Sequence, residues 1–161
     1  MSFRNGFYLG ALCAIALGLF LVRLWQPEQQ VSKHSEHLLN AIVDRDWDRF
    51  EKFIAEDYHD QWGHDREMVM QRTRAVARYA RGLQINAIAP NVWIENRVGY
   101  WRAYISIEGD KDNEVVALMK ERVNTVKTPF ELKWHRKSGK PWDWKLVSVR
   151  NSELELPEAY H

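Results

Sequence analysis

The chain has almost none of the cysteine that thiol-based sites need. Cys13 is its single cysteine and lies inside an apolar run, so the rest of the 161 residues contain none. This excludes an internal disulfide, a cysteine zinc cluster and a cysteine nucleophile beyond that run. Repeats and low-complexity tracts are missing as well. With 45% apolar and 28% charged residues the chain can bury a core, which excludes wholesale disorder.

A surplus of either charge is also missing. Of the 23 basic residues all but Arg4 and Arg23 lie beyond Pro27, which leaves 21 against all 22 acidic residues. This balance gives no electrostatic pattern for nucleic acid, which we exclude as a partner. The first acidic residue is Glu28. The asymmetry indicates a membrane segment followed by one water-soluble domain.

Residues 7–22 form an uninterrupted uncharged run, and residues 7–25 predict a transmembrane helix. These 19 residues span about 28 Å as a helix, close to the roughly 30 Å of a bilayer core. Arg23 and Trp25 suit the lipid–water interface at its end. A cleaved signal peptide is the alternative, although the residues after the run lack the small side chains of a cleavage site.

This interpretation gives a leader at 1–6, a transmembrane helix at 7–25 that contacts membrane lipid, and a linker at 26–31. Basic residues flank the helix on both sides, at Arg4 and at Arg23 and Lys33. Since short leaders usually stay in the cytoplasm, we expect a single-pass protein of the bacterial inner membrane with its soluble domain periplasmic or otherwise extracytoplasmic.

Small residues recur every four positions along the predicted transmembrane helix. Gly6, Gly10, Ala14 and Gly18 would form one stripe, which permits close approach and pairing of two helices in lipid. The alternative is that glycine and alanine are simply common in membrane helices.

The soluble part begins with helical periodicity. Apolar residues from Leu38 to Ile54 recur at spacings of three and four, which predicts an amphipathic helix of about six turns, either continuous or broken near Asp46. Residues 58–62 fit a short strand. Asp65 is placed to cap a second long helix that ends at Gly82.

After Gly82 the pattern changes to strands. Five segments are rich in β-branched and aromatic residues and are separated by turn residues: 83–95, 98–108, 115–125, 130–136 and 142–151. Helices followed by hairpin-linked strands predict an α+β fold in which a curved antiparallel sheet wraps the helices.

This order of elements resembles the nuclear transport factor 2-like superfamily, also called SnoaL-like, over roughly residues 32–152. The stretch DRDWDRFEKFIAEDYHDQW at 44–62 is similar to the family's helix turn, second helix and acidic ending, with Arg45 in place of the usual glycine. The strand WKLVSVRN at 144–151 is similar to its last strand. The resemblance implies a cone-shaped domain, with residues 153–161 as a tail, and these motifs specify fold rather than activity.

The resemblance to ketosteroid isomerases argues against that chemistry. The positions of the family's carboxylate base and its tyrosine fall on Trp62 and Leu38, neither of which can do the job. The position of the late-strand acid falls near 130–132, where only Glu131 could serve if the register slipped by one residue.

Another polar group lies near the expected mouth of the cone. His59, Asp60 and His64 are weak catalytic candidates, since an imidazole beside a carboxylate can act as a general base. Together with Asp65 their spacing matches no metal motif, and the alternative is a polar loop with a helix cap. We predict neither a metal nor a cofactor.

Eight tryptophans are many for this length. Those on predicted strands are bulky enough to fill a core under a curved sheet. The alternative is an aromatic pocket for an apolar ligand, or a protein interface, where tyrosine and arginine are enriched. The residues assigned to this pocket or interface are Trp62, Tyr100, Arg102, Tyr104 and Trp134.

The last predicted hairpin is basic. Lys133, Arg136, Lys137, Lys140 and Lys145 lie among three tryptophans. Such a hairpin can lie on anionic headgroups or bind nucleic acid, and the alternative is a solvated hairpin whose lysines guard a sheet edge.

Taken together, the residues favour a membrane-anchored domain that acts as a noncatalytic binding or assembly module, similar in architecture to the inner-membrane assembly component of type IV secretion systems. We expect a homodimer and, in addition, a protein partner. The alternative is a small enzyme or an apolar-ligand carrier that uses the cone.

Overall fold

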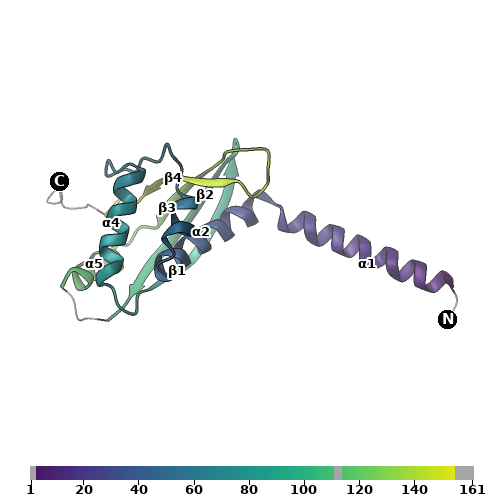
Figure 1. Cartoon of the computed structure of the whole chain (residues 1–161), viewed down its shortest axis with the longest axis horizontal. Coiled ribbons are helices and arrows are strands. Elements are labelled where there is room, and N and C mark those ends of the chain that lie inside the picture. Colours follow the sequence, from purple (N-terminus) through teal and green to yellow (C-terminus); the bar gives the residue numbers. More distant parts are fainter. Residues whose placement is uncertain (1–2, 111–113, 155–161) are drawn as a thin grey trace.

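The computed structural model describes residues 3–110 and 114–154, and its helices and strands follow one another in the predicted order in most places (Figure 1). Their bounds are α1 Phe3–Leu24, α2 Pro27–Val43, α3 Trp47–Phe53, α4 Arg66–Tyr79, β1 Gln84–Glu95, β2 Val98–Glu108, α5 Glu114–Thr125, β3 Phe130–Arg136 and β4 Trp144–Arg150. The α+β prediction is confirmed, with four strands in place of the five expected.

The sheet is an antiparallel meander in the order β1-β2-β3-β4. Asn96 and Arg97 both have positive φ, at 49° and 67°, which is the backbone of the tight turn that joins twisted strands. Strand β1 is irregular between Ile88 and Asn91, where Ala89 has φ 52° and Pro90 follows. The bulge bends β1 and adds to the curvature of the sheet.

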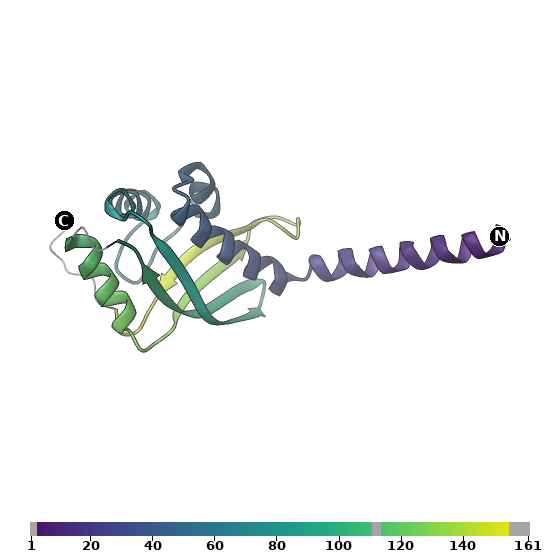
Figure 2. The same cartoon turned by 90° about the horizontal axis from the view of Figure 1, so that it is seen from below.

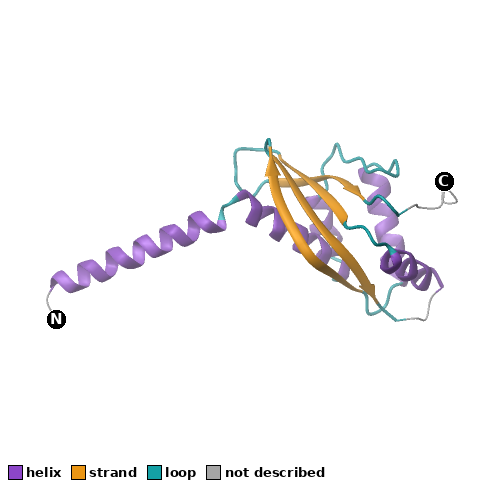
Figure 3. Ribbon diagram, turned by 180° about the vertical axis from the view of Figure 1, so that it is seen from behind, coloured by secondary structure: helices purple, strands orange, loops and turns teal. Residues whose placement is uncertain are grey.

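Helix α2 crosses the concave face of this sheet (Figure 2). The approach is close at Gly99, where an added Cβ would lie 2.4 Å from Val31 Cγ2, so the sheet needs a residue without a side chain there. The core between helices and sheet contains these buried residues: Val31, Leu38, Ala41, Phe50, Ile54, Tyr58, Met70, Trp101, Ala103, Leu132, Trp134, Trp144 and Leu146. The convex face of the sheet points away from α2 (Figure 3).

The long first helix of the soluble part is broken near Asp46, one of the two predicted forms. Arg45, at φ 57°, turns the chain between α2 and α3, and the Asp46 side chain accepts a hydrogen bond from Arg49 N at 3.1 Å. Asp65 caps α4 as predicted, with its carboxylate accepting from Met68 N at 2.8 Å.

The strand predicted at 115–125 is wrong, because these residues form helix α5. Val116 and Val123 are buried seven positions apart, on one helical face, and the residues between them are strong helix formers. The Asn124 amide pairs with the backbone of Ile107, accepting from its N–H at 2.8 Å and donating to its carbonyl at 3.0 Å. The side chain thereby replaces a neighbouring strand at this point of β2.

The strand predicted at 58–62 is also wrong. The segment is a loop with one bridge between His59 and Asp65, and it runs along the outer edge of β4. Ala55 N donates to Leu146 O at 2.9 Å and His59 N donates to Val147 O at 3.0 Å. These bonds cover the edge of the sheet without forming a regular strand.

Helix α1 extends away from the domain (Figure 1). Within the described residues no single helix is both long and apolar enough to cross a membrane, and Ala11–Arg23 and Pro27–Val43 satisfy the two conditions only as a pair bent by 64°. The predicted linker 26–31 is corrected, because Pro27 begins α2 in the first-turn position that proline favours. Of the small-residue stripe, Gly18 has open space around it, and the surroundings of Gly6 and Gly10 lie outside the described residues. The same holds for residues 155–161 of the predicted tail.

Candidate functional site

The loop before α4 brings three polar side chains together in the core. Asp60 and His64 are each 7% exposed, and His64 Nδ1 lies 2.9 Å from Asp60 Oδ2. Tyr58, 3% exposed, points its hydroxyl at the same oxygen from 3.4 Å. Since a carboxylate accepts hydrogen bonds, Nδ1 of His64 is the donor in this pair. Of the predicted candidates, the loop thus joins Asp60 and His64, while His59 is exposed and outside the cluster.

The same carboxylate also organises the loop backbone. Asp60 Oδ1 accepts from Trp62 N and from His64 N, both at 2.9 Å, and Gly63 has φ 81° between them. Asp60 therefore has four donors around its two oxygens. A carboxylate held in this way is an orienting group for His64 rather than a free proton acceptor.

Burial sets the protonation state of Tyr58. Burial first, and then the neighbouring charge of Asp60, raise the pKa of the Tyr58 hydroxyl well above its usual range. The phenol therefore stays protonated at physiological pH. The cluster can hold one histidine in a fixed tautomer, and it contains no second group prepared to transfer a proton.

The two positions that the sequence resemblance assigns to the base and the tyrosine of isomerases, Trp62 and Leu38, carry no group for acid–base chemistry. Leu38 is a core residue, 3% exposed, and Trp62 donates its indole N–H to Leu154 O at 2.8 Å. Glu131 pairs with Arg102 on the convex face of the sheet, away from the core. Within residues 3–110 and 114–154, no group of three or more His, Cys, Asp or Glu side chains is arranged to hold a metal ion.

Two fully buried tryptophans lie inside the cone. Trp101 and Trp134 are both 0% exposed, and neither indole N–H has a hydrogen-bond acceptor among the described protein atoms. Trp134 packs edge-on against His34 and Phe53, with ring centres 5.8 and 6.2 Å apart. Trp134 is therefore a core residue and is not part of an exposed surface.

The convex face of the sheet presents an ordered aromatic surface. Trp93 and Tyr100 stack with centroids 5.0 Å apart and planes 9° apart, and the Arg102 guanidinium lies 5.0 Å from the Trp93 ring. Glu131 fixes Arg102 from the next strand through an ion pair. Tyr104 extends the same face and is 44% exposed. We call Trp93, Tyr100, Arg102, Tyr104 and Glu131 the convex patch.

Asn151 anchors the loop before α4 and was not among the predicted site residues. Asn151 is buried, and its side-chain oxygen accepts from Glu153 N and Leu154 N at 2.9 and 2.8 Å, while its amide donates to Thr128 O at 3.0 Å. Its backbone N–H donates to the side chain of Gln61. The only signal in the sequence is an asparagine at the end of a predicted strand.

Comparison with known proteins identifies the fold. No protein-family model matches the chain, and no curated protein matches it. Among solved structures, Bd1075 of Bdellovibrio bacteriovorus superposes with a TM-score of 0.58 at 15% identity over 76% of this chain. This chain spans only 38% of the length of that protein. An NTF2-like protein of unknown function from Pseudomonas putida gives 0.55 at 13% identity, over 76% of this chain and 82% of that one.

The fold is nuclear transport factor 2-like. The CaMKII hub of S. rosetta has it too, with a TM-score of 0.56 at 14% identity over 77% of this chain and 94% of the hub. Further similar structures carry the provisional names dehydratase, aromatic ring hydroxylase and ketosteroid isomerase. At these identities the likeness defines the nuclear transport factor 2-like architecture and leaves the activity open.

Proposed function

We propose that this chain is a single-pass inner-membrane protein whose nuclear transport factor 2-like domain, on the periplasmic side, is a noncatalytic binding and assembly module. The convex patch is the observation that carries the assembly role. It combines stacked aromatic rings with an arginine already held by Glu131, so that little side-chain freedom is lost when a partner covers it.

The exposure of α1 supports the membrane part of the proposal. Leu12, Leu17 and Val22, at successive spacings of five positions, point to three different sides of the helix and are 63–65% exposed. A helix that is apolar all round is stable where lipid or another protein surrounds it, and the uncharged run 7–22 favours lipid.

The core supports the noncatalytic part. The resemblance to isomerases assigns the positions of their acid and base to Leu38 and Trp62. All four hydrogen bonds to the Asp60 carboxylate come from inside the protein. The partner we propose for the convex patch is a second copy of the chain, a further protein being bound by the resulting dimer.

Photocrosslinking in intact membranes tests the proposal. A benzophenone amino acid replaces Tyr104 on the convex patch or, as a matched control, Tyr79 on α4, which is 53% exposed. We expect protein crosslinks from position 104 only, and the same crosslinks when His59 and His64 are both changed to Ala. Equal amounts of crosslinked protein from positions 104 and 79 would contradict the role of the convex patch. Recovery of the full chain from the soluble fraction of lysed cells would remove the membrane anchor.

A small-molecule enzyme or carrier is the second candidate. The indole N–H groups of Trp101 and Trp134 favour it, because a buried donor without an acceptor costs about 1–3 kcal/mol and an oxygen-bearing apolar ligand would satisfy it. Native mass spectrometry of protein purified from its membrane tests this candidate. A stoichiometric small molecule that is lost in the Trp101→Phe variant would favour the carrier over the assembly module.

A further inference from the structure

The two exposed tryptophans of the described chain lie at one end of the domain. Trp25 is 52% exposed at the end of α1, and Trp142 is 53% exposed in the β3–β4 turn. The other six tryptophans are buried or half-buried. A large exposed indole in an otherwise well-packed domain indicates a surface that is covered in use.

The topology of the sheet fixes this end. In an antiparallel meander alternate turns lie at the same end, so the β1–β2 turn at Asn96 and Arg97 and the β3–β4 turn lie together, as the pairing of Val98 with His135 shows. The opposite end holds α5 and residue Ser152, which follows β4. All three ribbon views place the β3–β4 turn beside the junction of α1 and α2 (Figures 1, 2 and 3).

Contacts hold this turn firmly against the helices. The Trp142 backbone carbonyl hydrogen-bonds with His34 of α2, and Trp144 donates its indole N–H to Pro141 O at 2.9 Å. Lys137 pairs with Asp57 at 2.7 Å. The exposure of Trp142 is therefore a property of a fixed turn, because the buried Trp144 holds Pro141 on one side of it and Asp57 holds Lys137.

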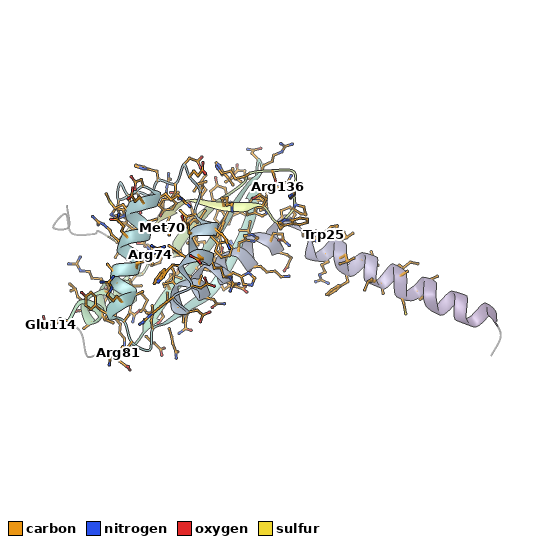
Figure 4. All side chains as sticks on the ribbon, in the orientation of Figure 1. Trp25, Met70, Arg74, Arg81, Glu114 and Arg136 are labelled. Atoms are coloured by element: carbon orange, nitrogen blue, oxygen red, sulfur yellow. The ribbon has the colours of Figure 1, made fainter. Side chains whose placement is uncertain are left out.

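The same turn is strongly basic. Residues 133–145 contain five lysine and arginine residues and one acidic residue, Asp143. Lys137 is already paired with Asp57, and Lys145 donates to the Lys52 carbonyl. Arg136 and the exposed Lys140 extend this basic surface. Figure 4 shows Arg136 at the end of the domain from which α1 extends. Arg97 adds a charge from the neighbouring turn.

We propose that the β3–β4 turn is a docking site for anionic lipid headgroups, with Trp142 at the lipid interface and Arg136 and Lys140 on the phosphates. Tryptophan prefers the headgroup level, and basic side chains are attracted to anionic lipid there. The proposal rests on the membrane anchor of the proposed function, because α1 brings this end of the domain to the bilayer. Helices α1 and α2 are bent by 64° relative to each other. The first turns of α2, and the β3–β4 turn beside them, therefore stay near the membrane surface at which α1 ends.

Docking would hold the domain in one orientation. The far end, with α5 and Ser152, points away from the bilayer, and the convex patch faces sideways along it. Two copies anchored in one membrane would then present their convex patches to each other. The headgroup contact would add to the α1 anchor and to the pairing of the convex patches in holding the assembly together.

Spin-label accessibility in lipid nanodiscs tests the proposal with the full chain. With Cys13 replaced by Ser, a nitroxide is placed at Ser138→Cys in the β3–β4 turn or, as a matched control, at Ser152→Cys at the far end; both serines are exposed. A water-soluble nickel relaxant reports which label is shielded. We expect shielding at 138 and none at 152 in discs with about a third phosphatidylglycerol, and little shielding at either position in phosphatidylcholine.

Charge variants sharpen the test. One basic side chain near an anionic surface changes an equilibrium by about five-fold, so Arg136→Gln with Lys140→Gln should lower the docked-to-free ratio about 25-fold. Lys127→Gln with Arg150→Gln removes the same charge at the far end and should leave the shielding at 138 unchanged.

Carbonate extraction of the same samples separates the two proposals. An inserted protein whose label at 138 is as open as the label at 152 in both lipids overturns docking and leaves the anchor. A protein that carbonate extracts overturns the anchor. If such an extracted protein still shows shielding at 138 on anionic discs, docking is supported without the anchor. If its label at 138 is as open as the label at 152, docking is overturned as well.

Discussion

Replacing Gly99 by Ala should destabilise the domain more than the same change at any other glycine whose surroundings the structure describes. The new Cβ would lie 2.4 Å from Val31 Cγ2, 3.2 Å from Trp144 Cζ3 and 3.3 Å from Ile94 Cδ1. Val31 is 0% exposed and sits on a helix, where a valine has one strongly preferred rotamer, so it cannot turn away cheaply. Helix α2 must move off the sheet instead.

Overpacking of a well-packed core costs about 1–3 kcal/mol, and the short contact to Val31 puts Gly99→Ala at the upper end of that range. For a domain of this size about 3 kcal/mol corresponds to a fall in Tm of roughly 10 °C. Urea and thermal unfolding of the full chain in detergent, followed by circular dichroism, measures both quantities. Gly139→Ala is the matched control, because nothing lies within 4 Å of its added Cβ, and it should change stability by less than about 0.5 kcal/mol.

A double-mutant cycle tests the close approach of Val31 to Gly99 directly. Val31→Ala removes the methyl that the new Cβ meets, so the Gly99→Ala and Val31→Ala pair should be at least about 1 kcal/mol more stable than the sum of the two single changes predicts. Additive effects, or a Gly99→Ala protein as stable as the Gly139→Ala protein, would show that α2 does not approach β2 as closely as described.

Three further changes test the site and the fold. Asp60→Asn replaces an acceptor of four hydrogen bonds by an amide and should cost about 2–4 kcal/mol in urea unfolding, while Asp57→Asn on the surface should cost little. Asn124→Ala removes both bonds to Ile107 and should speed hydrogen exchange of the Ile107 amide more than that of Trp101, which β3 covers. Burial lowers the pKa of His34, so the unfolded chain binds its proton first and stability should fall as the pH drops below about 6.5; His34→Gln should flatten that fall.

The strands were predictable where two signals agree. Residues 98–108 and 130–136 are rich in β-branched and aromatic residues and are flanked by turn residues, and the structure has both strands with the predicted bounds. Residues 115–125 carry the β-branched pair Val115 and Val116 followed by six helix formers. The β-branched pair led to the strand prediction, whereas the six helix formers indicate the helix that is present. The spacing of Val116 and Val123, seven positions, is also typical of one face of a helix.

The candidate site was predictable only in part. A strand at 58–62 would turn His59 and Asp60 to opposite faces, whereas the loop folds around Gly63 and brings Asp60 to His64 instead. The side chains around the Asp60 carboxylate come from one short loop, so its residues were found. Arg102 meets Glu131 across a strand pair 29 residues apart, a contact that depends on register and that no local pattern contains.

The bulge in β1 limits how copies of this domain can associate. Pro90 has no N–H to offer, and Ala89 turns the backbone away, so the outer edge of β1 is a poor template for another strand. The segment 54–59 covers the other edge of the sheet at β4. Growth by strand addition, which leads to fibres with no defined size, is therefore blocked at both edges. The proposed association through the convex patch would instead close after two copies, because each copy uses the same face.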